Sequence, residues 1–298
     1  MTGSDKSGRP RLACEIMTDR VVAARASAHG DAVEVHSTRS LPPGAVNPNL
    51  AGDNVADAET VKAALSDALN VVGTRGRDII AVLPDACLRV LLLDFDTLPD
   101  RPQDALGVVR FRLKKALPFD LDKASVTYHA FRDNGTVRVV AAVALTSVIE
   151  EYESLFRQLG YNPGVVLPSS VGALAQVDDE RPTLLVKVDT LTTTLAIVAS
   201  GQVLLFRTLD NAAGANVAAQ QLMDDIYPAI IFFEDTYHQK IELVTLAGLP
   251  IFNQVGAALE TQFGVPVMEI SARSAGEGFG GSTTPPSMLA SVVGALIG

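Results

Sequence analysis

The chain has 298 residues, of which 48% are hydrophobic, and a formal net charge of −10. This length fits one large domain or two modest ones, and the acidic balance argues against nucleic acid as the main partner, because phosphate binding needs a basic surface. No run reaches about 18 uncharged apolar residues, so we expect no membrane-spanning helix. The two cysteines lie in apolar runs and the four histidines are scattered, which predicts buried free thiols and no metal centre.

The N-terminal part of the chain predicts three short strands followed by a helix. The opening residues, MTGSDKSGRP, are small and polar, so we expect a disordered lead and no signal peptide. Short aliphatic and β-branched runs bounded by turn residues predict strands at 12–16, 21–26 and 32–36. A loop with three prolines follows over 41–54. Asp57 is then expected to cap a helix whose apolar face is Val61, Leu65, Leu69 and Val72.

Residues 78–145 predict a compact β-β-α-β-β unit inserted into the first lobe. Its elements are strands at 78–83 and 88–95, a helix at 101–117, and a hairpin of strands at 126–131 and 136–145 around Asp133-Asn134-Gly135. One face of the helix is basic, with Arg110, Arg112, Lys114 and Lys115. This face fits either an ordinary solvated surface or a docking surface for an acidic partner or anionic lipid headgroups.

The second half of the chain repeats the three-strand pattern of the first. A helix over 148–159, a strand at 165–167 and a crossing helix at 169–177 lead to a polar turn at 178–182, which we predict to be the lobe boundary. Beyond it, strands at 184–188, 194–198 and 203–207 form a second meander. Two copies of one unit, far apart, predict an internal duplication with two lobes.

The C-terminal third predicts further α/β structure and no phosphate-binding loop. Pro228 is expected to kink or split a helix over 212–238. The Gly/Ser/Pro stretch at 273–286 lacks the Lys-Ser or Lys-Thr of a nucleotide loop. The remaining predicted elements are a strand at 242–247, a helix at 252–263, a strand at 265–270 and a packed terminal helix at 288–298.

Three stretches in register resemble the PilM family of type IV pilus assembly proteins. They are LLVKVDTLTTTLAIVASGQVLLFRTL at 184–209, LKKALPFDLDKASVTY at 113–128, and the segment 241–270 with TLAGLP and FGVPVMEI. The resemblance implies an α/β, actin-like (ribonuclease H-like) fold of two duplicated lobes, related to FtsA. Its implied parts are a first lobe at 1–77 with 146–182 returning to it, the inserted subdomain at 78–145, and a second lobe at 183–298.

The same resemblance points to a nucleotide site whose motifs are degenerate. Such a site needs glycine in two phosphate turns and nearby acids for the metal. In the first turn the matching positions are Glu15, Met17 and Val22, where family members that bind ATP carry Asp, Gly and Lys. In the second turn Lys187 replaces the acid and Asp189 replaces glycine, although the hydroxyl run that begins at Thr192 is kept. In the third segment the glycine pair is reduced to Gly248.

These replacements oppose nucleotide binding. Met17 would occupy phosphate space, and the Asp189 carboxylate about 4 Å from phosphate would cost about 4 kcal/mol at an effective dielectric near 20. Ordinary roles fit the same residues, since Asp189 suits a turn and the threonines suit a strand. We therefore predict a pseudo-ATPase, in which ATP and Mg²⁺ are disfavoured.

The function implied by the resemblance is a non-catalytic scaffold of a type IV pilus or related secretion platform, cytoplasmic and peripheral at the inner face of the inner membrane. Its partner would be the cytoplasmic N-terminal tail of a PilN-like membrane protein, held in a groove between the first lobe and the insertion. A pilus motor or platform protein is a further candidate partner, and self-association into a homo-oligomer is a third alternative. The alternatives are a divergent ATPase or sugar-kinase-like enzyme, and a filament-forming relative. Candidate tail-binding residues, for which ordinary core packing is the competing interpretation, are Leu91, Leu93, Phe111, Leu117 and Phe119.

Overall fold

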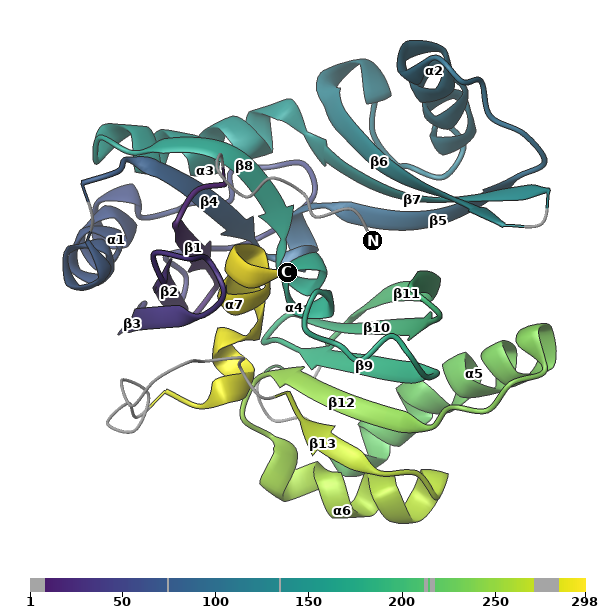
Figure 1. Ribbon diagram of the computed structural model, residues 1–298. Coiled ribbons are helices and arrows are strands. Elements are labelled where there is room, and N and C mark those ends of the chain that lie inside the picture. Colours follow the sequence, from purple (N-terminus) through teal and green to yellow (C-terminus); the bar gives the residue numbers. More distant parts are fainter. Residues whose placement is uncertain (1–8, 74, 134, 212–213, 215–217, 271–283) are drawn as a thin grey trace.

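The computed structural model describes residues 9–73, 75–133, 135–211, 214, 218–270 and 284–298. The chain forms two α/β lobes, one above the other in Figure 1, and a smaller subdomain beside the first lobe. Within the described residues, no helix is both long enough and apolar enough to cross a membrane. The predicted loop at 273–286 lies largely outside these residues.

The first lobe is built on a five-stranded mixed sheet of order β3-β2-β1-β4-β8. β1 pairs antiparallel with β2 and parallel with β4, and β4 pairs parallel with β8. Alternate side chains of β1 lie on opposite faces of the sheet and pack in two separate cores. Leu12 and Cys14 face α1 and α3, while Ala13 faces α7. The lobe's elements are β1 Leu12–Ile16, β2 Arg20–Ala26, β3 Val33–Ser40, α1 Ala58–Val72, β4 Asp78–Leu83, α3 Thr146–Gln158 and β8 Asn162–Pro168.

The second lobe repeats this sheet, with order β11-β10-β9-β12-β13. β9 pairs antiparallel with β10 and parallel with β12, and β12 pairs parallel with β13, so every pairing matches its counterpart in the first lobe. The predicted duplication is confirmed. The elements are β9 Thr183–Val188, β10 Thr192–Ala199, β11 Gln202–Asp210, α5 Ala219–Tyr237, β12 Leu243–Gly248, α6 Phe252–Phe263 and β13 Val267–Glu269. α5 and α6 cover the outer face (Figure 1), and α5 continues through Pro228 as one helix, so this proline does not split it.

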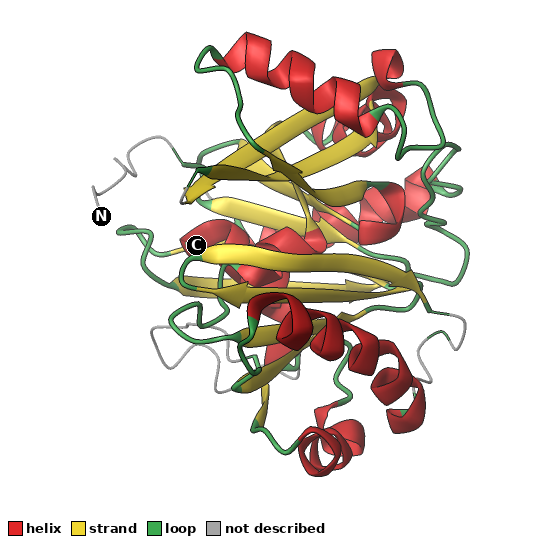
Figure 2. Cartoon of the chain, turned by 90° about the vertical axis from the view of Figure 1, so that its right-hand side faces the viewer, coloured by secondary structure: helices red, strands yellow, loops and turns green. Residues whose placement is uncertain are grey.

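The inserted subdomain is a three-stranded antiparallel sheet covered by one helix. Its order is β5-β7-β6, and α2 packs on one face through Val109 and Leu113. Figures 1 and 2 show α2 at the outer end of the subdomain, with the sheet between it and the second lobe. The elements are β5 Arg89–Phe95, α2 Pro102–Leu113, β6 Ala124–Asp133 and β7 Thr136–Leu145.

The structure corrects the predicted start of the insertion. The strand at 78–83, which is β4, pairs with β1 and β8 and so belongs to the first-lobe sheet. The insertion is therefore β-α-β-β, and its first strand is β5. A strand that is buried on both faces has the same sequence pattern in either sheet, and only its distant partners decide which sheet it joins.

The structure also moves the C-terminus from the second lobe to the first. α7 (Ala290–Ile297) packs against β1, β2 and β4, and it crosses α4 (Ser169–Leu174) between the two lobes (Figure 1). Two glycines make this crossing possible. A Cβ on Gly294 would lie 1.9 Å from the Gly172 carbonyl oxygen, and one on Gly172 would lie 2.5 Å from the Ser291 carbonyl oxygen. Backbone therefore meets backbone where α4 and α7 cross.

Candidate functional site

The two predicted phosphate turns meet between the lobes. Each closes a β-hairpin: the Met17 N–H donates to the Arg20 carbonyl at 2.8 Å, and the Asp189 N–H donates to the Thr192 carbonyl at 2.8 Å. The two turns line one cavity with Pro48, Pro84, Asp85, Ala86 and Leu191. Its volume is about 10 Å³, which is room for about one water molecule.

A buried cluster of charged side chains closes the space around this cavity. Lys187, on β9, pairs with Asp189 of its own turn and, at 3.5 Å, with Asp85 of the first lobe. Arg20, at the start of β2, lies 3.8 Å from Asp189 and 2.9 Å from Asp19. Lys187, Asp85, Arg20 and Asp189 are each at most 3% exposed. Charges of the first lobe thus pair with charges of the second, and we call this set, with Glu15, the inter-lobe cluster.

Neutral hydroxyl groups bind two of the cluster's acids, Asp85 and Glu15. The Ser170 N–H and hydroxyl donate to Asp85 Oδ1 at 3.0 and 2.7 Å. Ser169 donates to Glu15 and contacts the Ser291 hydroxyl at 2.9 Å, which connects β1 to the α4–α7 crossing. A buried carboxylate is tolerated only with partners of this kind.

Burial and charge act in opposite directions on the cluster's pKa values. Desolvation raises the pKa of Glu15 and of Asp85, although Lys187 lowers both in part. Burial alone would lower the pKa of Lys187, but the carboxylates of Asp189, Asp85 and Glu15 outweigh it and raise that pKa. Lys187 is therefore held as a cation at the centre of the cluster.

The remaining predicted nucleotide positions have structural roles. Met17 is 3% exposed beside the cavity, and Thr192 lines it. Val22 packs in the core against α7 and not at the cavity. Gly248 has φ +87°, and a Cβ there would lie 2.1 Å from the Val188 carbonyl oxygen. Glycine is needed at position 248 so that the end of β12 can pack against the β9 turn.

The residues present do not fit a Mg²⁺–nucleotide complex in this arrangement. The cavity is far smaller than a triphosphate, and the cation that could attract phosphate is already paired with two carboxylates. Across the described part of the chain, no group of three or more His, Cys, Asp or Glu is placed to hold a metal ion.

Sequence reasoning missed several members of the inter-lobe cluster. Asp85 and Arg20 lie between predicted strands, where the sequence assigns them no function, and the supporting Ser169 and Ser170 lie in the predicted helix at 169–177. One signal was available: Lys187 and Asp189 are two residues apart at the end of a strand, so their side chains share a face. The long-range partner Asp85 had no local signal.

A second feature is a groove between the first lobe and the inserted subdomain. It has a volume of about 250 Å³. In the hydrogen-bonded sheets of the described residues, β8 pairs only with β4 and β6 only with β7, so both strands are sheet edges, and both contribute to the groove. The lining is mostly apolar: Leu83, Leu88, Ser125, Thr127, Ala142, Val143, Ala144, Ile149, Glu153, Val166, Leu167 and Pro168.

None of the predicted tail-binding residues lines this groove. Leu91, Leu93, Leu117 and Phe119 are partly buried against the subdomain's own core. Phe111 is 74% exposed on α2. The predicted location between first lobe and insertion thus coincides with a real groove, but different side chains form it.

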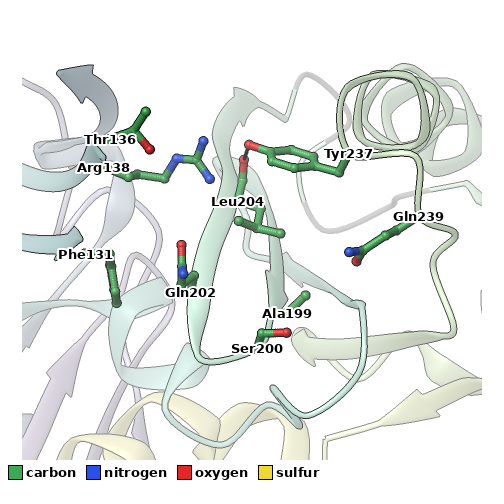
Figure 3. A pocket seen from close by; sticks show the side chains of 9 residues that line it. All are labelled: Phe131, Thr136, Arg138, Ala199, Ser200, Gln202, Leu204, Tyr237 and Gln239. Atoms are coloured by element: carbon green, nitrogen blue, oxygen red, sulfur yellow. Dashed lines mark hydrogen bonds between the residues drawn. The ribbon is translucent and has the colours of Figure 1, made fainter. Parts of the chain in front are cut away.

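A third cavity lies between the subdomain and the second lobe (Figure 3). It has a volume of about 320 Å³. Arg138 of β7 reaches over the Tyr237 ring at 5.4 Å and pairs with Asp94 at 2.9 Å, while the Tyr237 hydroxyl donates to the Leu204 carbonyl at 3.2 Å. The Arg138–Tyr237 contact connects the subdomain to the second lobe. Because Arg138 is already paired with Asp94, the cavity offers little to an anionic ligand.

Comparisons with known proteins give similarity in structure only. No protein family and no curated protein sequence matches the chain. A solved "PilM-PilN type IV pilus biogenesis complex" matches with a TM-score of 0.78 at 17% identity, over 97% of this chain and 98% of that one. The cytoplasmic domain of EpsL, an inner membrane component of the type II secretion system of Vibrio cholerae, matches with a TM-score of 0.54 at 12% identity, over 96% and 94%. The ethanolamine utilization protein EutJ from Carboxydothermus hydrogenoformans gives 0.50 at 12%, over 97% and 89%. The chain therefore has the actin-like fold of PilM, as predicted.

Proposed function

We propose that this protein is a non-catalytic actin-like scaffold that holds the cytoplasmic N-terminal tail of a PilN-like membrane protein, at the inner-membrane platform of a type IV pilus or related secretion system. The observation that carries the proposal is the groove between β8 and β6, in a chain that has the fold of a protein solved as a PilM–PilN complex. The proposed location is the cytoplasmic face of the inner membrane.

The groove suits an extended peptide. Free strand edges offer backbone N–H and C=O groups to an added strand, and alternate side chains of that strand can enter apolar pockets. Here both walls have such an edge, and Ala142, Ile149 and Leu167 contribute apolar surface. Glu153 is the acidic side chain in the lining, but it already pairs with Arg157 of α3, so the fit to a tail rests on the apolar surface and the two strand edges.

The inter-lobe cluster supports the non-catalytic part of the proposal. In an ATPase of this fold the space between the two turns receives phosphates and metal, whereas here Lys187 and Asp85 use it to join the lobes. Because Leu92 and Val140 of the subdomain sheet pack against the second lobe, fixing the lobes would hold the β8–β6 groove in one geometry, which favours a peptide that binds a preformed site.

The test is a calorimetric titration with a synthetic peptide of the cytoplasmic N-terminal tail of the single-span membrane protein encoded beside this one. Ala142→Glu places a charge in the groove, and Ala142→Leu fills it without a charge; we expect each to weaken binding at least tenfold. Phe119→Ala, in the subdomain core, should lower thermal stability and leave affinity within about twofold. Normal binding by both Ala142 variants, or no binding by the unaltered protein, would contradict the proposal.

A further inference from the structure

The outer face of α2 carries an exposed aromatic ring among cations. Phe111 is 74% exposed and Val108, one turn before it, is 37% exposed. Arg112, Lys114 and Lys115 are exposed beside them. We call these five residues the α2 patch.

The helix geometry puts Phe111 at the centre of this patch. At about 100° per residue, it points away from the side chains that bury the helix, Val109 and Leu113. Arg112 and the C-cap residue Lys114 follow roughly 100° and 60° to either side of it, and Lys115 lies in the turn after the helix. The subdomain core therefore uses the opposite face, and no ring contact or core cluster of the described residues includes Phe111.

Ordinary structural roles explain only part of the patch. Cations in the last turn of a helix interact favourably with its dipole, but an exposed Phe gains nothing from the dipole. Arg110 is engaged elsewhere: it donates to the Leu121 and Ala124 carbonyls and lies 3.6 Å from Asp122. Among the described residues, no ion pair involves Arg112, Lys114 or Lys115. Three unpaired cations surrounding an exposed ring remain to be explained.

We propose that the α2 patch is a docking surface for an anionic lipid membrane, with the Phe111 ring inserted at the headgroup level and the three cations bound to headgroup phosphates. Charge complementarity carries the choice of partner, because this local basic patch stands on a chain with a net charge of −10. Long, unpaired cations on both sides of one ring suit mobile headgroups better than the fixed carboxylates of a protein partner.

The expected affinity is modest. Each basic residue near an anionic bilayer contributes about fivefold in partitioning, so three contribute about a hundredfold, and one aromatic ring adds to this. Such a contact would be reversible and salt-sensitive. It does not depend on the proposed tail peptide, and it would keep the subdomain near a membrane whether or not that peptide binds.

The absence of tryptophan from the chain allows a direct test. In Phe111→Trp the single indole should shift to shorter wavelength with vesicles of phosphatidylcholine mixed with phosphatidylglycerol, and not with phosphatidylcholine alone. Phe232→Trp, at a ring that is 43% exposed on α5, is the matched control and should show no shift.

Cosedimentation of the unaltered chain with the same vesicles gives the second measurement. Lys114→Glu with Lys115→Glu should lower bound protein at least tenfold, Phe111→Ser should lower it several-fold, and Lys240→Glu on the second lobe should change it less than twofold. Equal binding by all variants, or no binding and no indole shift, would overturn the proposal. So would a double charge reversal that leaves vesicle binding intact but changes the oligomeric mass measured by light scattering, because the patch would then be a protein contact.

Discussion

Lys187 of β9 lies 3.5 Å from Asp85 of the segment after β4, and both side chains are almost completely buried. This ion pair joins the two lobes beside the two turns that the sequence resemblance predicts as phosphate turns. A buried ion pair adds little net stability compared with an apolar pair, yet its geometry is specific, and removing one partner leaves an uncompensated charge. The pair therefore favours a closed arrangement of the lobes.

Replacing Lys187 by Met should strongly destabilise the protein. Asp85, Asp189 and Glu15 would then share one buried cation, Arg20, so we expect the free energy of unfolding to fall by about 3–5 kcal/mol. Urea denaturation measures this. Lys62→Met is the matched control, since its pair with Glu59 is at the surface and should contribute at most about 1 kcal/mol. A loss from Lys187→Met no larger than that of the control would contradict the role assigned to the cluster.

The raised pKa of Glu15 predicts how stability changes with pH. A folded carboxyl with a raised pKa binds its proton more tightly than the unfolded chain does, so stability falls as pH rises above the ordinary value of 4.5 and through the folded pKa. Glu15→Gln keeps an acceptor for Ser169 and removes this titration. We expect the variant to be more stable than the unaltered protein near pH 7 and similar below pH 4.5.

Unfolding measured in urea across this pH range tests the prediction, with Glu59→Gln at the surface as the control. The raised pKa of Lys187 acts in the same direction at high pH, because stability is lost as pH rises past its ordinary value of 10.5 and through the folded pKa. If Glu15→Gln were less stable than the unaltered protein at pH 7, the carboxylate would be a stabilising ion in the fold.

The meanders could be predicted from the sequence because each strand is a short apolar run between turn residues. Thr183–Val188 and Thr192–Ala199 are joined by a tight turn, so their pairing is local. The sheet that β4 joins could not be predicted in this way, because its partners β1 and β8 lie far from it in the sequence. The same distinction applies to the inter-lobe cluster. Lys187 and Asp189 are near neighbours in the sequence, so their proximity could be predicted, whereas the position of Asp85 beside them depends on tertiary structure.

The α7 helix shows why apolar patterning alone could not place the C-terminus. Apart from Ser291 its residues are apolar, and all from Ala290 to Leu296 are buried. Such a helix fits any apolar layer. The close approach of Gly294 to Gly172 selects the crossing with α4, and that selection depends on backbone shape, which hydrophobic periodicity does not report.

A comparison of two glycines tests the close approach at the end of β12. Gly248→Ala would bring a Cβ to 2.1 Å from the Val188 carbonyl oxygen at φ +87°, whereas Gly264 has φ +68° with nothing within 4 Å of its added Cβ. Both variants bear the strain of a left-handed conformation, about 1–2 kcal/mol, but only the first must move backbone. We expect Gly248→Ala to lower the free energy of unfolding by at least about 2 kcal/mol more than Gly264→Ala. Equal losses in urea denaturation would show that the β12 end adjusts freely.

The last prediction concerns the nucleotide. We expect the unaltered protein to bind Mg²⁺–ATP no more tightly than about 1 mM, because Met17 and the paired Asp189 occupy the space between the turns. Met17→Gly with Asp189→Gly removes a bulky side chain and a carboxylate, and it releases Lys187 and Arg20 from Asp189 as cations beside the turns. Calorimetry should then show tighter nucleotide binding by the double variant.

Met17→Gly alone provides the control, since it opens space but keeps the carboxylate against phosphate, and it should bind little better than the unaltered chain. Circular dichroism must show that the double variant remains folded, because Lys187 and Arg20 then lose the pairing with Asp189 and Lys187 keeps its pair with Asp85. Micromolar ATP affinity of the unaltered protein would favour the divergent ATPase instead of the scaffold. A folded double variant that still binds no nucleotide would mean that the lobes stay closed for another reason, with the Glu15–Ser169 contact at the α4–α7 crossing as the next group to alter.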